Sequence, residues 1–162
     1  MADRHAVVPA TAEHVGMLAA NLRAQDLAEI AGTGSTVKRS LWRGYRNSIL
    51  VETAFVDGEV AAMWGLCCGY VPGLSLLSDV GRPWLLTTAA VERVPVTTVR
   101  EARRAVERML MVKPVLENYV LASYDQAVRM LRMIGFTIDP PQPVGRDGEP
   151  YSRFHMRRPC HG

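Results

Sequence analysis

The sequence has few of the residues that bind metals or form disulfides. It contains three cysteines, Cys67, Cys68 and Cys160, and four histidines. No two cysteines have the Cys-x-x-Cys spacing of a zinc site, and no two histidines lie one helical turn apart. Cys67 and Cys68 are adjacent, so on a strand their side chains point to opposite faces and do not easily bond to each other. We therefore predict reduced thiols and no metal site, including at the terminal group His155, Cys160 and His161.

Long apolar segments are also missing. No apolar run approaches the roughly 20 residues of a membrane-spanning helix. Residues 1–5 lack the apolar core of a secretory signal peptide. These absences predict a soluble protein without a membrane segment, in a reducing, cytoplasm-like compartment.

Lysine is scarce in this chain. Of the 19 basic residues only Lys38 and Lys113 are lysines, and the net charge is +3. A guanidinium group pairs better than an ammonium group with anions such as carboxylate and phosphate, because its fork of donors meets two of their oxygens at once. However, the arginines are spread along the chain without a basic run, so a compositional bias explains them as well as a function does.

The remaining composition is that of a folded domain. The 162 residues are 48% hydrophobic and 22% charged, which predicts a single domain over 1–162. The apolar periodicity predicts strands at 6–10, 50–56, 59–70, 84–91, 118–123, 136–138 and 151–157, and helices at 12–30, 36–49, 96–112 and 125–134. Asp57-Gly58 predicts a type I′ hairpin turn, and 71–83 a loop. This order predicts an α/β (α+β) fold with a mixed, mostly antiparallel central sheet flanked by helices.

A family resemblance is carried by residues 123–136, which read Ser-Tyr-Asp-Gln-Ala-Val-Arg-Met-Leu-Arg-Met-Ile-Gly-Phe. Ala127, Gly135 and Phe136 match the closing signature of the GCN5-related N-acetyltransferases, in which Asn-x-x-Ala begins a helix and Tyr-x-x-x-Gly-Phe ends it. Gly135 suits a helix end at positive φ and Phe136 suits packing on the sheet, so these matches concern the fold. The resemblance implies a core at 6–139, followed at 140–162 by a Pro-rich connection, a last strand and a C-terminal arm.

The positions that carry the family's chemistry differ in this chain. The family's Asn falls on Tyr124, and its Tyr, the general acid, falls on Leu131, which has no proton to donate. The family's glycine-rich phosphate loop falls on residues 92–100, which contain no glycine, and Pro95 lacks an N–H donor. We therefore predict a degenerate, non-catalytic fold, a pseudoenzyme without a cofactor. The alternative is an N-acetyltransferase that uses acetyl-CoA.

Four residues are weak candidates for the remaining chemistry. Glu92 would act as a general base, or would only favour the start of a helix electrostatically. Tyr124 would donate a proton from an unusual position, or would only pack. Arg93 and Arg100 are the candidates for a phosphate contact.

A second, narrower resemblance covers roughly residues 59–155. Its motifs are Trp-Leu-Leu-x-Thr from Trp84, Asn-Tyr-Val from Asn118, Gly-Phe-Thr-Ile from Gly135 and Pro-x-Pro-x-Gly ending at Gly145. The ordered set resembles small proteins of tailed bacteriophages, including an internal virion protein of short-tailed phages with an acetyltransferase-like domain. The resemblance implies a structural protein of the virion (internal, ejected or in the tail region), oligomeric and bound to other virion proteins. The alternatives are a cytoplasmic location and acyl-CoA-dependent N-acetyl transfer.

A basic helix face is the predicted partner-binding surface. Arg100, Arg104 and Arg108 follow one another at one-turn spacing on the polar side of helix 96–112. Together with Arg157 and Arg158 they would meet an acidic protein surface or DNA phosphates. Two interleaved glutamates make a solvated helix face an equally good explanation.

Overall fold

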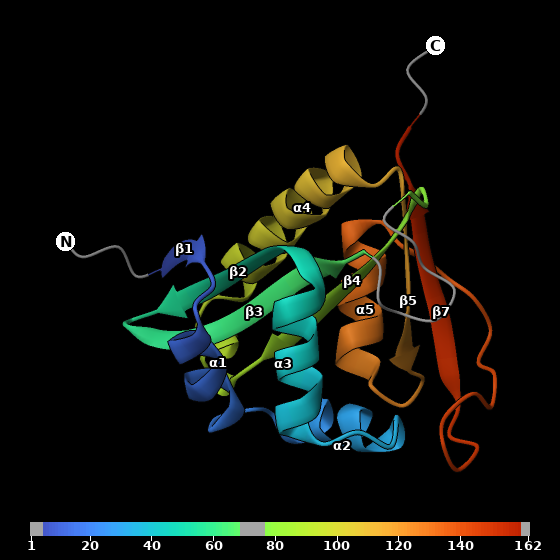
Figure 1. Cartoon of the computed structure of the whole chain (residues 1–162), viewed down its shortest axis with the longest axis horizontal. Coiled ribbons are helices and arrows are strands. Elements are labelled where there is room, and N and C mark those ends of the chain that lie inside the picture. Colours follow the sequence, from blue (N-terminus) through green and yellow to red (C-terminus); the bar gives the residue numbers. More distant parts are fainter. Residues whose placement is uncertain (1–4, 69–76, 160–162) are drawn as a thin grey trace.

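In a computed structural model, which describes residues 5–68 and 77–159, the described strands form one mixed seven-stranded sheet (Figure 1). The strands are β1 (His5–Pro9), β2 (Ser48–Val56), β3 (Glu59–Cys67), β4 (Val80–Thr87), β5 (Val115–Leu121), β6 (Thr137–Ile138) and β7 (Tyr151–Arg157). Their order across the sheet is β1-β2-β3-β4-β5-β7-β6. Only β4 and β5 run parallel among these neighbours. The predicted mixed, mostly antiparallel sheet is confirmed.

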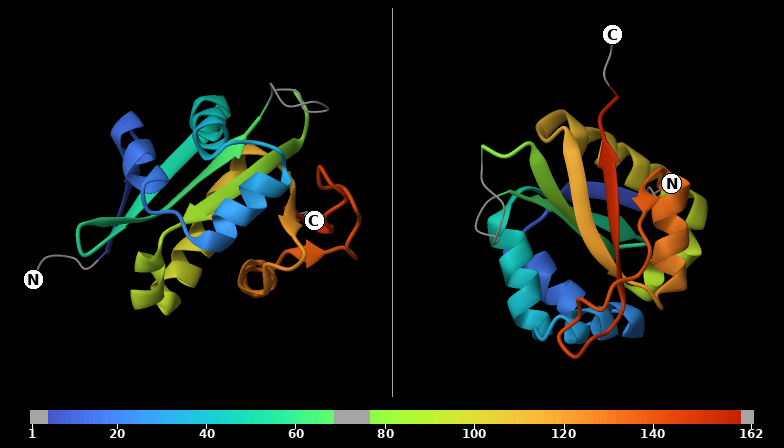
Figure 2. Two further views of the ribbon diagram at one scale, coloured as in Figure 1. Left: turned by 90° about the horizontal axis from the view of Figure 1, so that it is seen from below. Right: turned by 90° about the vertical axis from the view of Figure 1, so that its right-hand side faces the viewer.

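Helices cover both faces of the sheet (Figure 2). They are α1 (Ala12–Ala19), α2 (Ala24–Gly32), α3 (Val37–Asn47), the short 3₁₀ helix η1 (Ala89–Arg93), α4 (Pro95–Val112) and α5 (Asp125–Ile134). One buried cluster joins α1 and α3 to the sheet through residues such as Leu18, Leu41 and Met63. A larger cluster joins α4 and α5 to the other face, with Met109 and Phe136 at its centre. Two apolar layers therefore hold the sheet between the helices.

Local sequence signals set two of the sharpest bends. Asp57 and Gly58 have φ values of 50° and 82°, as the predicted type I′ turn between β2 and β3 requires. Gly135 ends α5 at a φ of 106°, a conformation that residues with a side chain rarely adopt. Phe136 then donates its N–H to the Leu131 carbonyl and packs beneath the helix. Both bends were correctly predicted.

The predicted helix over 12–30 is wrong, because two helices occupy that segment. α1 ends at Ala19 and α2 begins at Ala24. Between them Leu22 forms a bridge with Thr88, and the Arg23 N–H donates to the Thr87 carbonyl at 3.3 Å. Pairing with the end of β4 outweighs the helical preference of the sequence, a tertiary effect that local periodicity does not report.

Several predicted strand boundaries also shift. β4 runs from Val80 to Thr87 and not over 84–91, because the Thr88 side chain accepts the Ala90 N–H and begins η1. β5 begins at Val115, before the predicted 118. β3 ends at Cys67 instead of 70, and α3 ends at Asn47 instead of 49. Residues 69–76, which include much of the predicted 71–83 loop, lie outside the described residues.

The last strand is an internal strand of the sheet. β7 pairs with β5 on one side and with β6 on the other, both antiparallel. The predicted core boundary at residue 139 therefore stays a prediction, although β7 adds a strand beyond it. Residues 160–162 of the predicted arm lie outside the described part of the chain.

Candidate functional site

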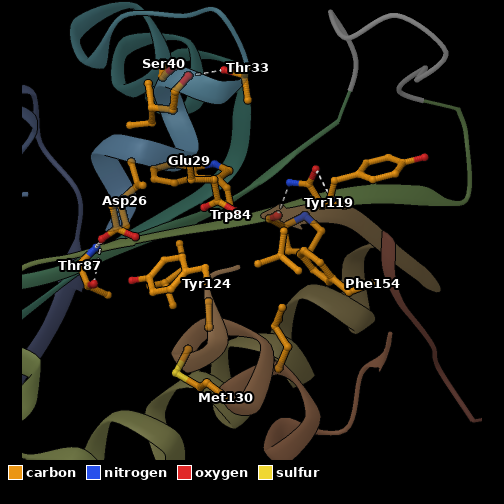
Figure 3. Close-up of a pocket in the computed structure, with 18 of the residues that line it drawn as sticks. Asp26, Glu29, Thr33, Ser40, Trp84, Thr87, Tyr119, Tyr124, Met130 and Phe154 are labelled. Atoms are coloured by element: carbon orange, nitrogen blue, oxygen red, sulfur yellow. Dashed lines mark hydrogen bonds between the residues drawn. The ribbon is translucent and has the colours of Figure 1, made fainter. Parts of the chain in front are cut away.

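The candidate site lies where β4 and β5 separate. The two parallel strands pair only over the first two residues of each. Beyond that point the Asn118 side chain stands between them, donating to the Pro83 carbonyl at 2.8 Å and accepting the Tyr119 N–H at 2.9 Å. A cleft of about 1410 Å³ opens at this separation, lined by side chains of α2, α3, α4, α5 and both strands (Figure 3). The separation of the strands thus places a large cleft in the middle of the sheet.

One edge of β4 is free to bind a ligand within this cleft. Alternate residues of a strand turn their N–H and C=O groups toward the same edge. The Pro83 carbonyl and the Thr87 N–H both bond to groups on the side away from β3. Leu85 lies midway between them, so its N–H and C=O also face the gap, where β5 no longer pairs with β4. The cleft therefore offers a backbone donor and a backbone acceptor side by side.

Helix α2 places two carboxylates at the far end of the separated strands. Asp26 accepts the backbone N–H of Thr87 at 3.0 Å and its hydroxyl at 2.9 Å, at the end of β4. Glu29 accepts the backbone N–H of Leu121 at 2.9 Å, at the end of β5. The two acids are three residues apart, so they share one face of the helix. Helix α2 therefore bridges the two diverging strands through its carboxylates (Figure 3).

The two carboxylates differ in how well the ionised form is stabilised. Burial raises the pKa of Asp26, while hydrogen bonds from the Thr87 backbone, the Thr87 side chain and Tyr124 act in the opposite direction. Burial raises the pKa of Glu29 to about 7; the Leu121 N–H lowers it and the charge of Asp26 raises it further. Glu29 has a single hydrogen-bond donor where Asp26 has several. Glu29 is therefore the carboxylate that exchanges its proton near neutral pH.

The same burial makes Glu29 a cost to stability at high pH. Its pKa is about 7 in the fold against 4.5 for the free group, so the folded state binds more protons than the unfolded state between these values. Stability from this group is therefore present at low pH and is lost as the pH rises through that window. We expect Glu29→Gln to raise the free energy of unfolding by about 1–3 kcal/mol at pH 8 and to change it little at pH 4.5. Urea unfolding at both pH values measures this, and equal stabilisation at both would contradict it.

Two buried tyrosines pack around the α2 carboxylates. Burial, together with the charge of Asp26, raises the pKa of Tyr124 to about 12. Burial and the charge of Glu29 raise the pKa of Tyr151 to about 12, and its hydroxyl donates to the Glu29 carbonyl at 2.9 Å. Both phenols therefore keep their protons across the physiological range. They act as hydrogen-bond donors that fix α2 against the strands.

The four predicted site residues fall in three places. Glu92 and Tyr124 line the cleft; the exposed Glu92 carboxylate lies 3.0 Å from a guanidinium nitrogen of Arg23. Arg93 instead pairs with Asp57 and Glu59 at the β2–β3 turn. Arg100 lies outside the cleft lining, with its Nε 3.6 Å from Glu101. The fold thus brings Glu92 and Tyr124 near Asp26 and Glu29, two acids that the sequence analysis did not single out.

The predicted partner-binding arginines are largely engaged within the chain. Arg104 pairs with Glu101 at 2.8 Å, and Arg108 reaches across to Glu52 on β2 at 2.5 Å. Arg158 donates to the Leu110 carbonyl at the end of α4. Arg157, like Arg158, is exposed. Their role toward a partner stays a prediction.

The beginning of α4 also faces the cleft. Pro95 and Thr98 line it, and the Thr98 N–H is taken by the Val94 carbonyl at 2.9 Å. Val96 and Thr97 lie in the first turn, where the backbone N–H groups have no partner within the helix. Such donors bind anions without any special side chain. The helix start therefore has two amide donors in the turn beside the cleft, although Val96 and Thr97 are not themselves among the residues that line it.

Two negative findings apply to residues 5–68 and 77–159. Within these ranges no group of three or more His, Cys, Asp or Glu side chains is placed to hold a metal ion. Over the same ranges no helix is long and apolar enough to span a membrane.

Comparisons with known proteins identify the fold. No family model and no curated protein matches the chain. Among solved structures, the aminoglycoside acetyltransferase AAC(6')-Ib with ribostamycin and coenzyme A is similar at a TM-score of 0.71 and 17% identity, covering 96% of this chain and 94% of that one. A GNAT-family acetyltransferase from Streptococcus pneumoniae is similar at 0.63 and 13%, covering 96% and 99%. YncA from Salmonella typhimurium, solved with its cofactor acetyl-CoA, is similar at 0.58 and 13%, covering 99% and 97%.

These similarities establish that the chain has the GCN5-related N-acetyltransferase fold, as the closing signature predicted. They correct a second prediction, that of a protein without a cofactor. The similar structures of AAC(6')-Ib and YncA contain coenzyme A and acetyl-CoA, which contradicts that prediction and points to its stated alternative, acetyl-CoA. None of the similar structures reported above is a phage virion protein. The predicted resemblance to virion proteins therefore has no support from them.

Proposed function

We propose that this protein transfers an acyl group from an acyl-CoA to an amine, with Glu29 as the general base. The observation that carries the proposal is the Glu29 carboxylate at the end of β5, inside the cleft between the separated strands. A half-buried carboxylate with a pKa of about 7 holds or releases a proton at physiological pH, as a general base must. The solved acetyltransferases with the same fold support this reaction class over a virion role.

The residues of the cleft fit an acyl-CoA. The coenzyme A part of this ligand is a long chain with amide groups and a pyrophosphate. When bound, the acyl-CoA supplies an acyl group activated as a thioester. The N–H and C=O of Leu85 suit the amides, because the free edge of β4 pairs with any extended amide chain. The amides of Val96 and Thr97 suit the phosphates. Arg129, which also lines the cleft from α5, adds positive charge.

Each acidic or phenolic group of the site then has a distinct role. Glu29 accepts the proton that the acceptor amine must lose to become nucleophilic. Asp26 accepts hydrogen bonds from the hydroxyl and the backbone N–H of Thr87, and so holds α2 against the end of β4. The Tyr124 hydroxyl stays protonated at physiological pH. Its proposed role in the site is therefore that of a hydrogen-bond donor. Glu92 pairs with Arg23 at the cleft rim and positions the start of α4.

We expect acetyl-CoA to bind with a micromolar Kd, about −8 kcal/mol, in isothermal titration calorimetry. Leu85→Pro should weaken this binding by about 10-fold, because proline removes the N–H that faces the cleft. That N–H lies on the side away from β3, so the β3–β4 pairing keeps its hydrogen bonds. Leu85→Ala is the matched control, since it shortens the same side chain and keeps the N–H.

Circular dichroism of both variants checks that the sheet is intact. Equal losses of affinity in the two variants would assign the effect to the side chain and not to the strand edge. Absence of any binding by the unaltered protein at millimolar acetyl-CoA would overturn the proposed function.

A further inference from the structure

The cleft carries a group of arginines on one wall. Arg39 and Arg43 extend from α3, and Arg82 extends from β4 beneath them. The Nε of Arg82 is buried, yet it has no hydrogen-bond partner within residues 5–68 and 77–159. A buried guanidinium nitrogen without a partner is costly, so it calls for an explanation. The Nε of Arg108 is unpartnered in the same way, but the Arg108 guanidinium has an ion pair with Glu52, whereas Arg82 has no ion pair to any described residue.

Arg82 and Arg43 line the same cleft from two different elements. Arg82 is directly opposite Cys67 in the β3–β4 register, on the sheet face that α3 covers. Burial raises the pKa of the Cys67 thiol, while the positive charges of Arg82 and Arg43 both act to lower it. Two guanidinium groups from different elements therefore converge near one side chain. Such a pair is suited to hold a carboxylate or a phosphate group.

The floor beside this pair is a tryptophan fixed in place. Trp84 donates its indole N–H to Ser48 at 2.8 Å. Its ring lies so close to Gly65 and Gly44 that a Cβ on Gly65 would stand 2.8 Å from the indole nitrogen, and one on Gly44 3.1 Å from the ring. The rigid ring lies in the same cleft as Glu29 (Figure 3). The wall arginines line that cleft as well, so ring and arginines form a preorganised wall.

The charges of the cleft do not balance. In addition to the three wall arginines, Arg146 lines the cleft without an ion pair to any described residue, and so does Arg129, which the proposed function assigns to the acyl-CoA. The acids of the lining are Asp26, Glu29 and Glu92, of which Glu92 is paired with Arg23. Residues 69–76, which are not described, contain no acidic side chain. The excess positive charge of the lining favours an anionic ligand.

We propose that the acceptor amine carries an anionic group, carboxylate or phosphate, which binds to Arg82 and Arg43 while its amine meets Glu29. This inference rests on the proposed function and narrows its substrate class. The amine nitrogen forms a bond to the acyl carbon, the carbon–sulfur bond breaks, and the electron pair stays on the sulfur. The proton lost by the nitrogen goes to Glu29. A polycationic acceptor such as ribostamycin, in contrast, is repelled by the arginine wall.

A set of acceptors that share an aminoethyl group tests the role of charge, and β-alanine and its amide are also matched in length. β-Alanine and phosphoethanolamine carry an anion where β-alaninamide carries a neutral amide. Release of the coenzyme A thiol measures kcat/KM for each, and for ribostamycin. We expect at least one of the two anionic acceptors to exceed the amide by about 10-fold or more, and ribostamycin to be the poorest. The relative rates of the two anionic acceptors distinguish carboxylate from phosphate. Equal or faster turnover of the neutral or cationic acceptors would overturn the proposal.

Variants of the wall locate the effect. Arg82→Gln and Arg43→Gln should each lower kcat/KM for the anionic acceptor by about 10- to 100-fold and leave the amide nearly unchanged. Arg46→Gln is the matched control, because Arg46 lies on the same helix but stacks over Trp42 outside the cleft lining. The affinity for acetyl-CoA should remain that of the unaltered protein. If Arg82→Gln weakens acetyl-CoA binding instead, the arginines hold the cofactor and the proposal fails.

A binding measurement keeps the test decisive if none of these acceptors is turned over. Calorimetry with N-acetyl-β-alanine, the product of the carboxylate acceptor, should show binding that Arg82→Gln abolishes. Inorganic phosphate should compete with it. No binding of either anion would overturn the acceptor assignment, even where acetyl-CoA binds and the proposed function stands.

Discussion

Replacing Glu29 with glutamine is expected to lower kcat for acyl transfer by about 100- to 1000-fold. A positioned general base contributes about this much, and glutamine cannot accept a proton. The amide oxygen of glutamine can still accept the Leu121 N–H, so the link between α2 and β5 is retained. Release of the coenzyme A thiol with a saturating amine measures the loss.

The pH profile tests whether the loss reflects a base. In the unaltered protein kcat/KM should fall as the pH drops below about 7, because Glu29 becomes protonated there. The residual activity of Glu29→Gln should lack that inflection. Affinity for acetyl-CoA should change little, which separates loss of a base from loss of the cleft. Retention of both the rate and the inflection would remove Glu29 from the mechanism.

Glu92→Gln distinguishes between the two acids that have been considered as the base. Glu92 is exposed and paired with Arg23, so its carboxylate lies at the rim of the cleft. A large loss of kcat in Glu92→Gln together with an active Glu29→Gln would return the role of base to Glu92. The geometry favours Glu29, because its carboxylate lies at the end of the separated strands and is half-buried.

The sequence signals for the fold are local, and those for the site are not. The Asp57-Gly58 turn and the Gly135-Phe136 helix end were predictable because each depends on the conformation that one or two residues favour. Asp26 and Glu29 look like ordinary polar positions of a helix. Their significance comes from contacts with Thr87 and Leu121, which are distant in the sequence. The three-residue spacing of two acids was the only local sign, and many solvated helices show it.

The predicted absence of a cofactor failed for a related physical reason. The prediction relied on side-chain identity, namely on glycines missing from 92–100 and on Leu131 in place of a tyrosine. A strand edge and a helix start bind ligands through backbone groups, which nearly every residue has. A search for sequence motifs therefore does not detect the backbone donors and acceptors of Leu85, Val96 and Thr97. The separation of β4 from β5 is what exposes such groups, and only the three-dimensional structure shows it.

Phe136→Ala is expected to cost about 3–5 kcal/mol of the free energy of unfolding. Phe136 is 5% exposed, and its ring meets Phe154 edge to face with 5.1 Å between centroids. Truncation removes this contact and leaves a cavity between α5 and the sheet that rigid strands on either side cannot close. For a chain of this size the melting temperature should fall by about 6–20 °C. Calorimetry measures the melting temperature, and urea unfolding measures the free energy.

Met133→Ala, at an exposed position on the same helix, should change stability by less than about 0.5 kcal/mol. A loss below about 1 kcal/mol in Phe136→Ala would mean that α5 does not pack on the sheet as the fold requires. The α5 wall of the cleft, which carries Arg129, would then be misplaced as well.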